Sequence, residues 1–215
     1  MDIIDFSSNV NPLGCHPGVK KFLKKQLKLI STYPDSDSSS LRSNLKWYTG
    51  LNESQILVGN GATEIIYNFT RAFLNEKTNV LIPIPTFSEY EKASRLSGCK
   101  ISFYKTFNLN EDIDDFLKSI PKNGAVFACN PNNPTGVLVK KSNMIKIIKN
   151  AQKKSSLVFL DETFIELISE TNQSLIRLIK SYDNLFILRS FTKSFGLAGL
   201  RIGYGVGNKE LVNIL

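Results

Sequence analysis

The sequence predicts an α/β protein with three α/β/α layers around a mostly parallel central sheet. Short apolar runs alternate with segments of helical period along most of the 215 residues, a pattern typical of a parallel sheet covered by helices. Turns rich in glycine or proline follow several of the apolar runs. The hydrophobic content of 42% is sufficient for one substantial core and excludes collagen-like and disordered chains.

The first 40 residues are interpreted as an N-terminal arm and loop, and residues 41–215 as one large domain. The arm contains one amphipathic pattern, in which five lysines between Lys20 and Lys28 alternate with apolar residues at helical spacing. We interpret the lysines as the solvated face of a surface helix. A polar, turn-rich stretch at residues 31–40 leads to a predicted helix over residues 41–49.

The remaining elements follow from the alternation of apolar runs and helical patterns. Strands are predicted at Gln55–Val58, Val80–Ile84, Lys100–Tyr104, Ala125–Cys129, Leu157–Leu160, Leu185–Leu188 and Arg201–Val206. Helices are predicted near residues 63–74, 86–97, 112–119, 142–153 and 174–181.

Composition also narrows the class of partner. The net charge of +8 favours an anionic ligand, but no nucleic-acid-binding motif accompanies the basic residues, so a small phosphate is preferred to nucleic acid. No apolar run reaches the roughly 18 residues that span a bilayer, and the start of the chain, with Met1, Asp2 and Asp5, lacks the features of a signal peptide. We therefore expect a cytoplasmic protein without membrane contact. The three cysteines and the single histidine lack the spacing of a metal site.

Chemistry in open α/β sheets lies beyond the carboxyl ends of the strands, so the residues after each strand are the most informative. The run from Gly59 to Glu64 joins a strand to a helix, where backbone amides and the helix dipole favour an anion, although a merely tight turn is an equal alternative. The run from Asn130 to Gly136 presents amide side chains on a loop made rigid by two prolines.

Two further strand ends carry ionisable groups. Asp161 ends an apolar strand, where a buried acid needs a cation or hydrogen bonds, although it could also be the acid at the start of a helix. Lys193 stands among apolar and small residues, a setting that lowers the pKa of an amine and suits Schiff-base chemistry. Arg201 can bind a phosphate through two hydrogen bonds, and Ser190 can donate another.

Three ordered motifs, NPNNPTG (130–136), DETF (161–164) and SFTKSFGLAGLRIGY (190–204), resemble the pyridoxal-phosphate-dependent aminotransferases of fold type I, class I/II. The resemblance implies pyridoxal 5′-phosphate as cofactor, bound covalently by Lys193. It also implies that Asp161 pairs with the pyridine nitrogen and Asn133 with the phenolic oxygen. The cofactor phosphate would be held by Ser190, Arg201 and the backbone amides of Ala62 and Thr63.

The resemblance extends to three further residues. Phe87 would stack on the pyridine ring, and Tyr33 would reach the phosphate bound by the partner subunit of a homodimer. Asn9, with Asn11 close by, lies in the arm that approaches the substrate in such families. The catalytic pair implied is Lys193 and Asp161.

Within the superfamily, the runs DFSSNVNPLG (5–14), GNGATE (59–64) and PTFSEYE (85–91) resemble threonine-phosphate decarboxylases of cobalamin synthesis, with histidinol-phosphate aminotransferases as near relatives. Phe164 supports the decarboxylase, because aminotransferases usually carry a tyrosine there. We expect decarboxylation of O-phospho-L-threonine, with an aminotransferase of histidinol phosphate or a related amino acid as the alternative. Either activity implies a small phosphorylated amino-acid or amino-alcohol substrate.

The resemblance also implies a longer protein. Enzymes of this type carry a small C-terminal domain with the arginine that binds the substrate carboxylate, so the cofactor domain looks incomplete beyond Leu215. An alternative of another class is therefore a non-catalytic remnant that binds the cofactor without turnover.

Overall fold

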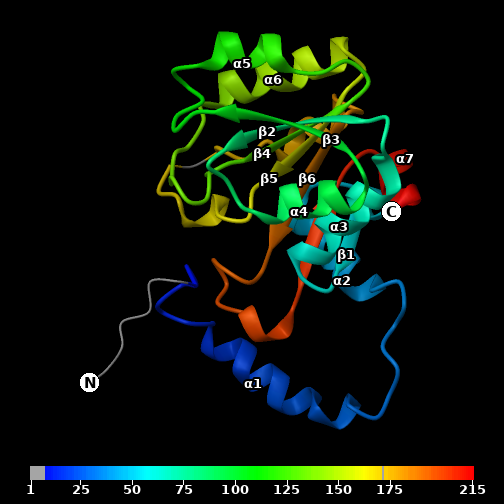
Figure 1. The fold of residues 1–215 in the computed structure, drawn as a ribbon. Coiled ribbons are helices and arrows are strands. Elements are labelled where there is room, and N and C mark those ends of the chain that lie inside the picture. Colours follow the sequence, from blue (N-terminus) through cyan, green and yellow to red (C-terminus); the bar gives the residue numbers. More distant parts are fainter. Residues whose placement is uncertain (1–7, 171) are drawn as a thin grey trace.

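The computed structural model of the protein describes residues 8–170 and 172–215, and within them seven strands form one sheet (Figure 1). The order across the sheet is β1-β7-β6-β5-β4-β2-β3. The strands are β1 (Ile56–Gly59), β2 (Asn79–Ile84), β3 (Lys100–Lys105), β4 (Ala125–Cys129), β5 (Leu157–Asp161), β6 (Leu185–Ser190) and β7 (Gly203–Val206). The predicted fold class is confirmed, and all seven predicted strands are present.

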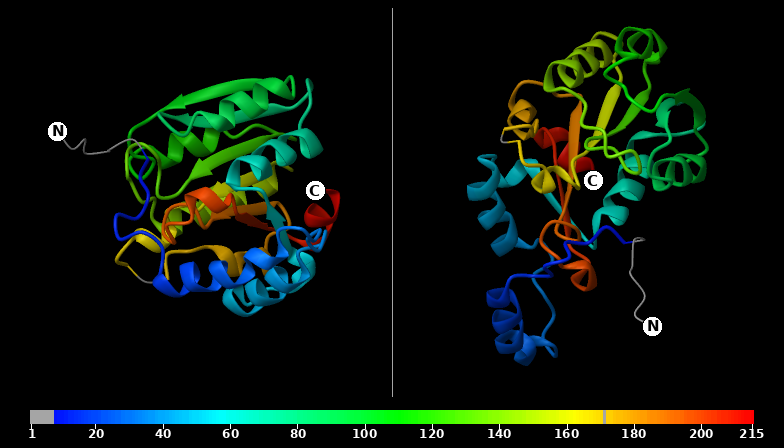
Figure 2. Two further views of the ribbon diagram at one scale, coloured as in Figure 1. Left: turned by 90° about the horizontal axis from the view of Figure 1, so that it is seen from below. Right: turned by 90° about the vertical axis from the view of Figure 1, so that its left-hand side faces the viewer.

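Helices cover both faces of the sheet and complete the three layers (Figures 1 and 2). The helices are α1 (Pro17–Gln26), α2 (Ser39–Thr49), α3 (Ala62–Phe73), α4 (Glu89–Leu96), α5 (Ile113–Ser119), α6 (Lys141–Lys153) and α7 (Lys209–Ile214). Helices α5 and α6 contribute Phe116, Met144 and Ile147 to the core on one face. On the other face, Phe69 of α3 and Tyr90 of α4 pack among aromatic side chains of the central strands.

The sheet is mixed because β7 runs antiparallel to both of its neighbours, β1 and β6. β7 begins at Gly203, two residues later than predicted, since Arg201 adopts a left-handed conformation with φ of 51° that cannot continue a strand. In the resulting register, Gly203 lies beside both Gly59 of β1 and Ser190 of β6. This register brings the end of β1, the start of β7 and the end of β6, which are far apart in sequence, side by side at one end of the strands.

The predicted helix at residues 174–181 is wrong in type. The segment forms a 3₁₀ helix of five residues, Ile176–Lys180. Its entry is fixed by Glu162, which accepts hydrogen bonds from the backbone amide of Leu175 and the hydroxyl of Ser174, both at 2.7 Å. The other predicted helices of the large domain are present, with boundaries that differ by up to three residues.

The N-terminal segment lies largely outside this packed body. Figures 1 and 2 show α1 and the loop after it standing away from the sheet, and none of the residues of α1 is buried. Its lysines are solvated as predicted, but its apolar side is also exposed, with Phe22 at 60%. The amphipathic pattern therefore predicted the helix correctly, but no part of the described chain buries its apolar side chains.

None of the helices among the described residues is long and apolar enough to cross a membrane. The interpretation of the acidic N-terminus and of residues 5–7 at the start of the DFSSNVNPLG motif concerns positions outside the described residues.

A buried ion cluster joins the ends of β5 and β6. Arg189, 5% exposed, lies with its Nε 3.0 Å from Glu162 Oε2, an ion pair without hydrogen-bond alignment. Its Nη1 donates to Glu166 and its Nη2 to Ser174 Oγ. Burial raises the pKa of Glu162, although Arg189 offsets part of that rise. One guanidinium thus compensates the buried carboxyl group of Glu162 and the partly buried one of Glu166.

We expect Arg189→Met to lower the free energy of unfolding by about 3–5 kcal/mol, because it leaves buried carboxyl groups without a cation. Urea denaturation of the cofactor-free chain measures this loss. The matched control is Arg95→Met, which removes an exposed ion pair with Glu91 on α4 and should change stability by no more than about 1 kcal/mol. Equal effects of the two substitutions would contradict the role given to the cluster.

Candidate functional site

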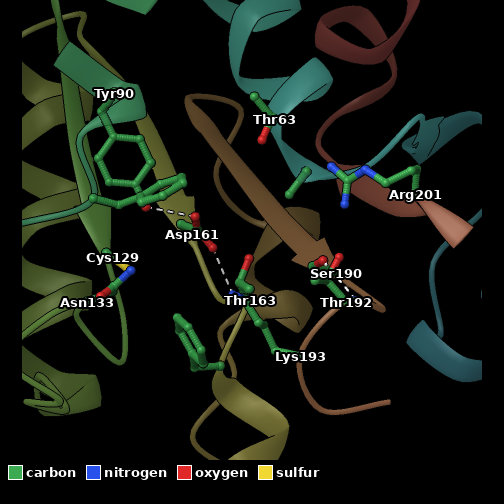
Figure 3. A pocket seen from close by; sticks show the side chains of 13 residues that line it. Thr63, Tyr90, Cys129, Asn133, Asp161, Thr163, Ser190, Thr192, Lys193 and Arg201 are labelled. Atoms are coloured by element: carbon green, nitrogen blue, oxygen red, sulfur yellow. Dashed lines mark hydrogen bonds between the residues drawn. The ribbon is translucent and has the colours of Figure 1, made fainter. Parts of the chain in front are cut away.

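The carboxyl ends of β4, β5 and β6 and the start of α3 surround a cavity of about 180 Å³ (Figure 3). It brings together eight of the ten residues that the sequence predicted as site residues. They are Ala62, Thr63, Phe87, Asn133, Asp161, Ser190, Lys193 and Arg201. The sheet places them together because the carboxyl ends of parallel strands meet at one edge. Their individual functions remain predictions.

Asp161, 3% exposed, presents the carboxylate of the cavity. Its Oδ2 accepts a hydrogen bond of 2.7 Å from the hydroxyl of Tyr90, and its Oδ1 accepts one of 2.8 Å from the backbone amide of Thr163 (Figure 3). No cation forms an ion pair with it among the described residues. Burial raises the pKa of Asp161, and these hydrogen bonds counteract part of the rise. The carboxylate is thus buried, oriented and open to a cationic partner from the cavity.

Tyr90 is a site residue that the sequence analysis missed. It is fully buried, stacks on Phe127 with ring centroids 5.3 Å apart and meets Phe87 edge to face at 5.6 Å. Its position three residues after Phe87 gave a signal, because residues at that spacing share a face at the start of a helix. Tyr90 therefore connects the predicted ring-stacking residue to the predicted acid.

The start of α3 and Arg201 form a corner of the cavity that is rich in hydrogen-bond donors, the predicted anion-binding corner. Gly61, before the helix, has a φ of 85° and provides no side-chain cap, so the first amides of the helix remain available. A Cβ at Gly61 would lie 2.6 Å from Arg201 Nη2, and one at Gly203 would lie 2.8 Å from the amide nitrogen of Ala62. The two glycines thus allow the guanidinium and β7 to approach these amides closely.

Ser190 completes this corner. It is buried at the end of β6, and its Oγ accepts a hydrogen bond of 3.1 Å from the backbone amide of Thr192. Its hydroxyl hydrogen remains able to donate to a ligand. Backbone amides, a guanidinium and a hydroxyl together form a donor set that suits a phosphate.

Lys193 lies in the irregular loop between β6 and β7, half-buried at the mouth of the cavity (Figure 3). Burial lowers the pKa of Lys193, and the nearby charge of Arg201 lowers it further. The amine donates a hydrogen bond to the backbone carbonyl of Ser8 and lies 5.9 Å from the ring centroid of Phe164. A lowered pKa leaves more of the amine in its nucleophilic form near neutral pH.

The three asparagines of residues 130–133 have different environments. Asn130 exchanges hydrogen bonds with the backbone of Val139, and Asn132 bonds to Thr86, Pro85 and Thr135. Both therefore stabilise the loop. Asn133 lines the cavity, as the resemblance implies.

Two predicted residues lie outside the cavity. Asn9 lines an adjoining, more open cavity that shares Asn133 and Phe164 with the first. Tyr33 is fully exposed and does not reach the cavity of its own chain. Its predicted contact with the cofactor of a partner subunit remains a prediction.

The residues present fit the pyridoxal phosphate that the resemblance implies. A buried carboxylate without a cation matches a pyridinium, an amine with a lowered pKa matches an aldehyde, and the corner at α3 matches a phosphate. The described residues contain no group of three or more His, Cys, Asp or Glu side chains that could hold a metal ion.

Comparison with known proteins gives a consistent picture. The sequence matches the family described as "Aminotransferase class I and II" over residues 1–215. A histidinol-phosphate aminotransferase of Geobacillus sp. (strain WCH70) is 36% identical over 213 residues, which are 98% of this chain and 58% of that protein.

Two solved structures extend the comparison. A histidinol-phosphate aminotransferase from Clostridium acetobutylicum aligns with a TM-score of 0.86 and 33% identity, covering 99% of this chain and 63% of its own. An L-threonine-O-3-phosphate decarboxylase from Porphyromonas gingivalis aligns with a TM-score of 0.86 and 32% identity, covering 99% and 62%. The chain thus spans about three fifths of the length of these relatives.

We expect Tyr90→Phe to lower the free energy of unfolding of the cofactor-free chain by about 1.5–3 kcal/mol, because the substitution keeps the packed ring and removes a hydrogen bond to a buried carboxylate. Chemical denaturation at pH 8 measures the change. Tyr67→Phe is the matched control, since Tyr67 donates a similar bond of 2.8 Å to the less buried Glu89. A loss no larger than in the control would contradict a special role for Tyr90.

We expect Asp161→Asn to stabilise the cofactor-free chain at pH 8, because burial raises the pKa of Asp161 above its ordinary value of 3.8. A raised pKa means that the folded state binds this proton more tightly than the unfolded state. Its contribution to stability is therefore complete below pH 3.8 and is lost as the pH rises through the folded value.

The measurement is urea denaturation of both proteins at several pH values. The stability difference in favour of Asp161→Asn should shrink as the pH falls from 8 towards 4. A difference that stays constant over this range would contradict the prediction.

Proposed function

We propose that this protein transfers an amino group between a small phosphorylated amine and an oxo acid, on the premise that the chain belongs to the aminotransferase class I and II family. Members of the family use pyridoxal phosphate. Histidinol phosphate is the proposed substrate, because the curated relatives matched over nearly the whole chain are histidinol-phosphate aminotransferases. Since the chain spans 58% of those relatives, the activity is proposed for the whole protein.

The observation that carries the proposal is the juxtaposition of Lys193, Asp161 and the anion-binding corner around one cavity. Ser190, Arg201 and the amides of Ala62 and Thr63 would hold the cofactor phosphate. Asp161 would keep the ring nitrogen protonated, and Tyr90 and the amide of Thr163 would hold that carboxylate in place. Asn133 and Phe87 would orient the ring through an amide hydrogen bond and an aromatic contact.

When bound, pyridoxal phosphate supplies an aldehyde that takes up the substrate amine and a ring that withdraws electrons from the adjacent carbon. Lys193 then acts as base and acid. Its amine, with a pKa lowered by burial and by Arg201, removes the proton from the substrate carbon that bears nitrogen. The ammonium group formed in this way would then donate that proton to the carbon that carries the aldehyde of the cofactor, on the same face. The half-buried position of Lys193 limits exchange of that proton with water.

A second candidate function is decarboxylation of O-phospho-L-threonine, the reading that the sequence favoured. The aminotransferase alternative is now better supported by the relatives. The decarboxylase is supported by Phe164, which brings a ring without a hydroxyl to within 5.9 Å of the Lys193 amine, and by the 32% identical Porphyromonas structure. The two reactions differ in the bond that is broken at the substrate carbon that bears nitrogen. An aminotransferase breaks the bond to hydrogen, and a decarboxylase breaks the bond to the carboxyl group.

A homodimer is part of the proposal. Several large apolar side chains between residues 13 and 48 are exposed, including Phe22, Ile30 and Trp47, each more than half exposed. Such a surface indicates an interaction site. A second copy of the chain would cover this surface. In that dimer, Tyr33 would contact the cofactor bound by the partner subunit. A cytoplasmic location likewise remains a proposal.

We expect the cofactor-loaded, full-length protein to convert L-histidinol phosphate and 2-oxoglutarate into imidazole acetol phosphate and glutamate, detected by mass spectrometry. Lys193→Ala should lower the rate by at least about 10³-fold, since it removes the proposed acid and base. The parallel assay offers O-phospho-L-threonine without an oxo acid.

Two outcomes decide between the candidates. Carbon dioxide and 1-amino-2-propanol phosphate from O-phospho-L-threonine, without transfer from histidinol phosphate, would replace the aminotransferase by the decarboxylase. Binding of the cofactor without turnover of either substrate would favour the non-catalytic alternative.

A further inference from the structure

The N-terminal arm contacts the loop that carries the proposed catalytic lysine. Asn11 makes two hydrogen bonds to this loop, from its backbone amide to the carbonyl of Lys193 at 3.1 Å and from its side-chain Nδ2 to the carbonyl of Ser194 at 3.0 Å. These partners are 182 and 183 positions away in sequence. Asn11 therefore links the backbone on both sides of the Lys193–Ser194 peptide bond to the arm.

The side chain of Asn11 is itself held in place. Its Oδ1 accepts a hydrogen bond of 3.0 Å from the amide of Leu13, and its backbone carbonyl accepts one of 2.9 Å from Gly14. This turn orients the amide group so that Nδ2 faces the loop. A side chain at this position needs both an acceptor and a donor, which a short amide provides.

The arm and the loop also pack together beyond these bonds. Gly196, with a φ of 64°, lies so close to the arm that a Cβ there would be 2.6 Å from the carbonyl carbon of Gly14. The loop is also held at its base, where the amide of Phe191 donates to the carbonyl of Ile202 at 3.2 Å, and the carbonyl of Lys193 accepts a second bond of 3.2 Å from Gly196 within the loop. Its bond from Ser194 Oγ to Glu166 is long at 3.4 Å. The arm thus provides two of the hydrogen bonds that hold the backbone of Lys193 and Ser194.

We propose that Asn11 is a positioning residue for Lys193, which holds the lysine loop in place so that the amine faces the cavity. The proposal rests on the proposed function, in which Lys193 reacts with the cofactor. Asn11 acts through the backbone of Lys193 and Ser194 and takes no part in proton transfer. The arm, whose Asn9 was predicted to approach the substrate, thereby gains a second role within the same chain.

Three variants of the full chain test the proposal. Asn11→Ala removes both side-chain interactions, whereas Asn11→Ser keeps an acceptor for the turn and loses the amide donor. Asn44→Ala is the matched control, because the exposed Asn44 also donates from Nδ2 to a backbone carbonyl, that of Ser40 at 2.8 Å. Circular dichroism establishes that each variant is folded.

The first readout is the rate at which pyridoxal phosphate becomes covalently attached to Lys193. The attached cofactor is trapped by borohydride reduction at successive times and measured by peptide mass spectrometry. We expect at least about a tenfold decrease in Asn11→Ala, a smaller decrease in Asn11→Ser and no change in Asn44→Ala. In turnover, the decrease should appear in kcat rather than in KM. Attachment at the wild-type rate in both Asn11 variants would overturn the proposal.

The second readout requires no cofactor. The rate of acetylation of Lys193 in the cofactor-free chain, relative to the exposed Lys118 of α5, reports how firmly the loop is held. We expect Lys193 to be modified several times faster in Asn11→Ala than in the wild type. An unchanged acetylation ratio would overturn the role of Asn11, whether or not the wild type attaches the cofactor. Failure of the wild type to attach the cofactor would count against the proposed function alone.

Discussion

A buried carboxylate with no ion-pair partner among the described residues is the constraint on which the site depends, and the charge of Arg189 offsets only part of the rise in its pKa that burial causes. Asp161 ends an apolar strand in which residues 158–160 are fully buried, and it is itself 3% exposed, so its charge has little access to water. Its two hydrogen bonds, from Tyr90 and Thr163, orient the group but add no positive charge. A cationic ligand ring in the cavity would supply that charge, which gives a physical reason why an acid persists at this position.

A second set of charged groups lies at the ends of β5 and β6, next in sequence to the residues that face the cavity. Glu162 follows Asp161, and Arg189 precedes Ser190, so the alternation of side chains separates an ion cluster from the cavity. In the cluster the charges compensate each other, and Ser174 and Leu175 complete the hydrogen bonding. In the cavity the acid and the phosphate-binding groups remain available. The cluster thus stabilises the strand ends from which the site residues extend.

The lysine loop shows a different principle, because its position is set from outside the sheet. Strand β6 ends at Ser190 and β7 begins at Gly203, and Asn11 of the arm bonds to two peptide carbonyls in the loop between them. Helix α1, which belongs to the same arm, has no buried residue, and its Phe22 is 60% exposed. A partner that covers α1 would therefore also act on the segment that orients Lys193.

The sequence by itself determined the layer order of the fold and most of the site. Apolar runs of buried strands are local signals. Asp161 and Ser190 end such strands, and Asn133 lies in the loop that follows another, so the common edge of a parallel sheet brings them together. Tertiary structure decided what depends on contacts between distant segments. Tyr90 acquires its role only because its hydroxyl, carried by α4, reaches Asp161 at the end of β5, and Asn11 acquires its role only because the arm contacts the lysine loop. β7 starts two residues later than predicted because Arg201 adopts a left-handed conformation and lies close to Gly61. Periodicity reports which side of an element is apolar, but the partner of a polar group 71 or 183 residues away is fixed only by the folded chain.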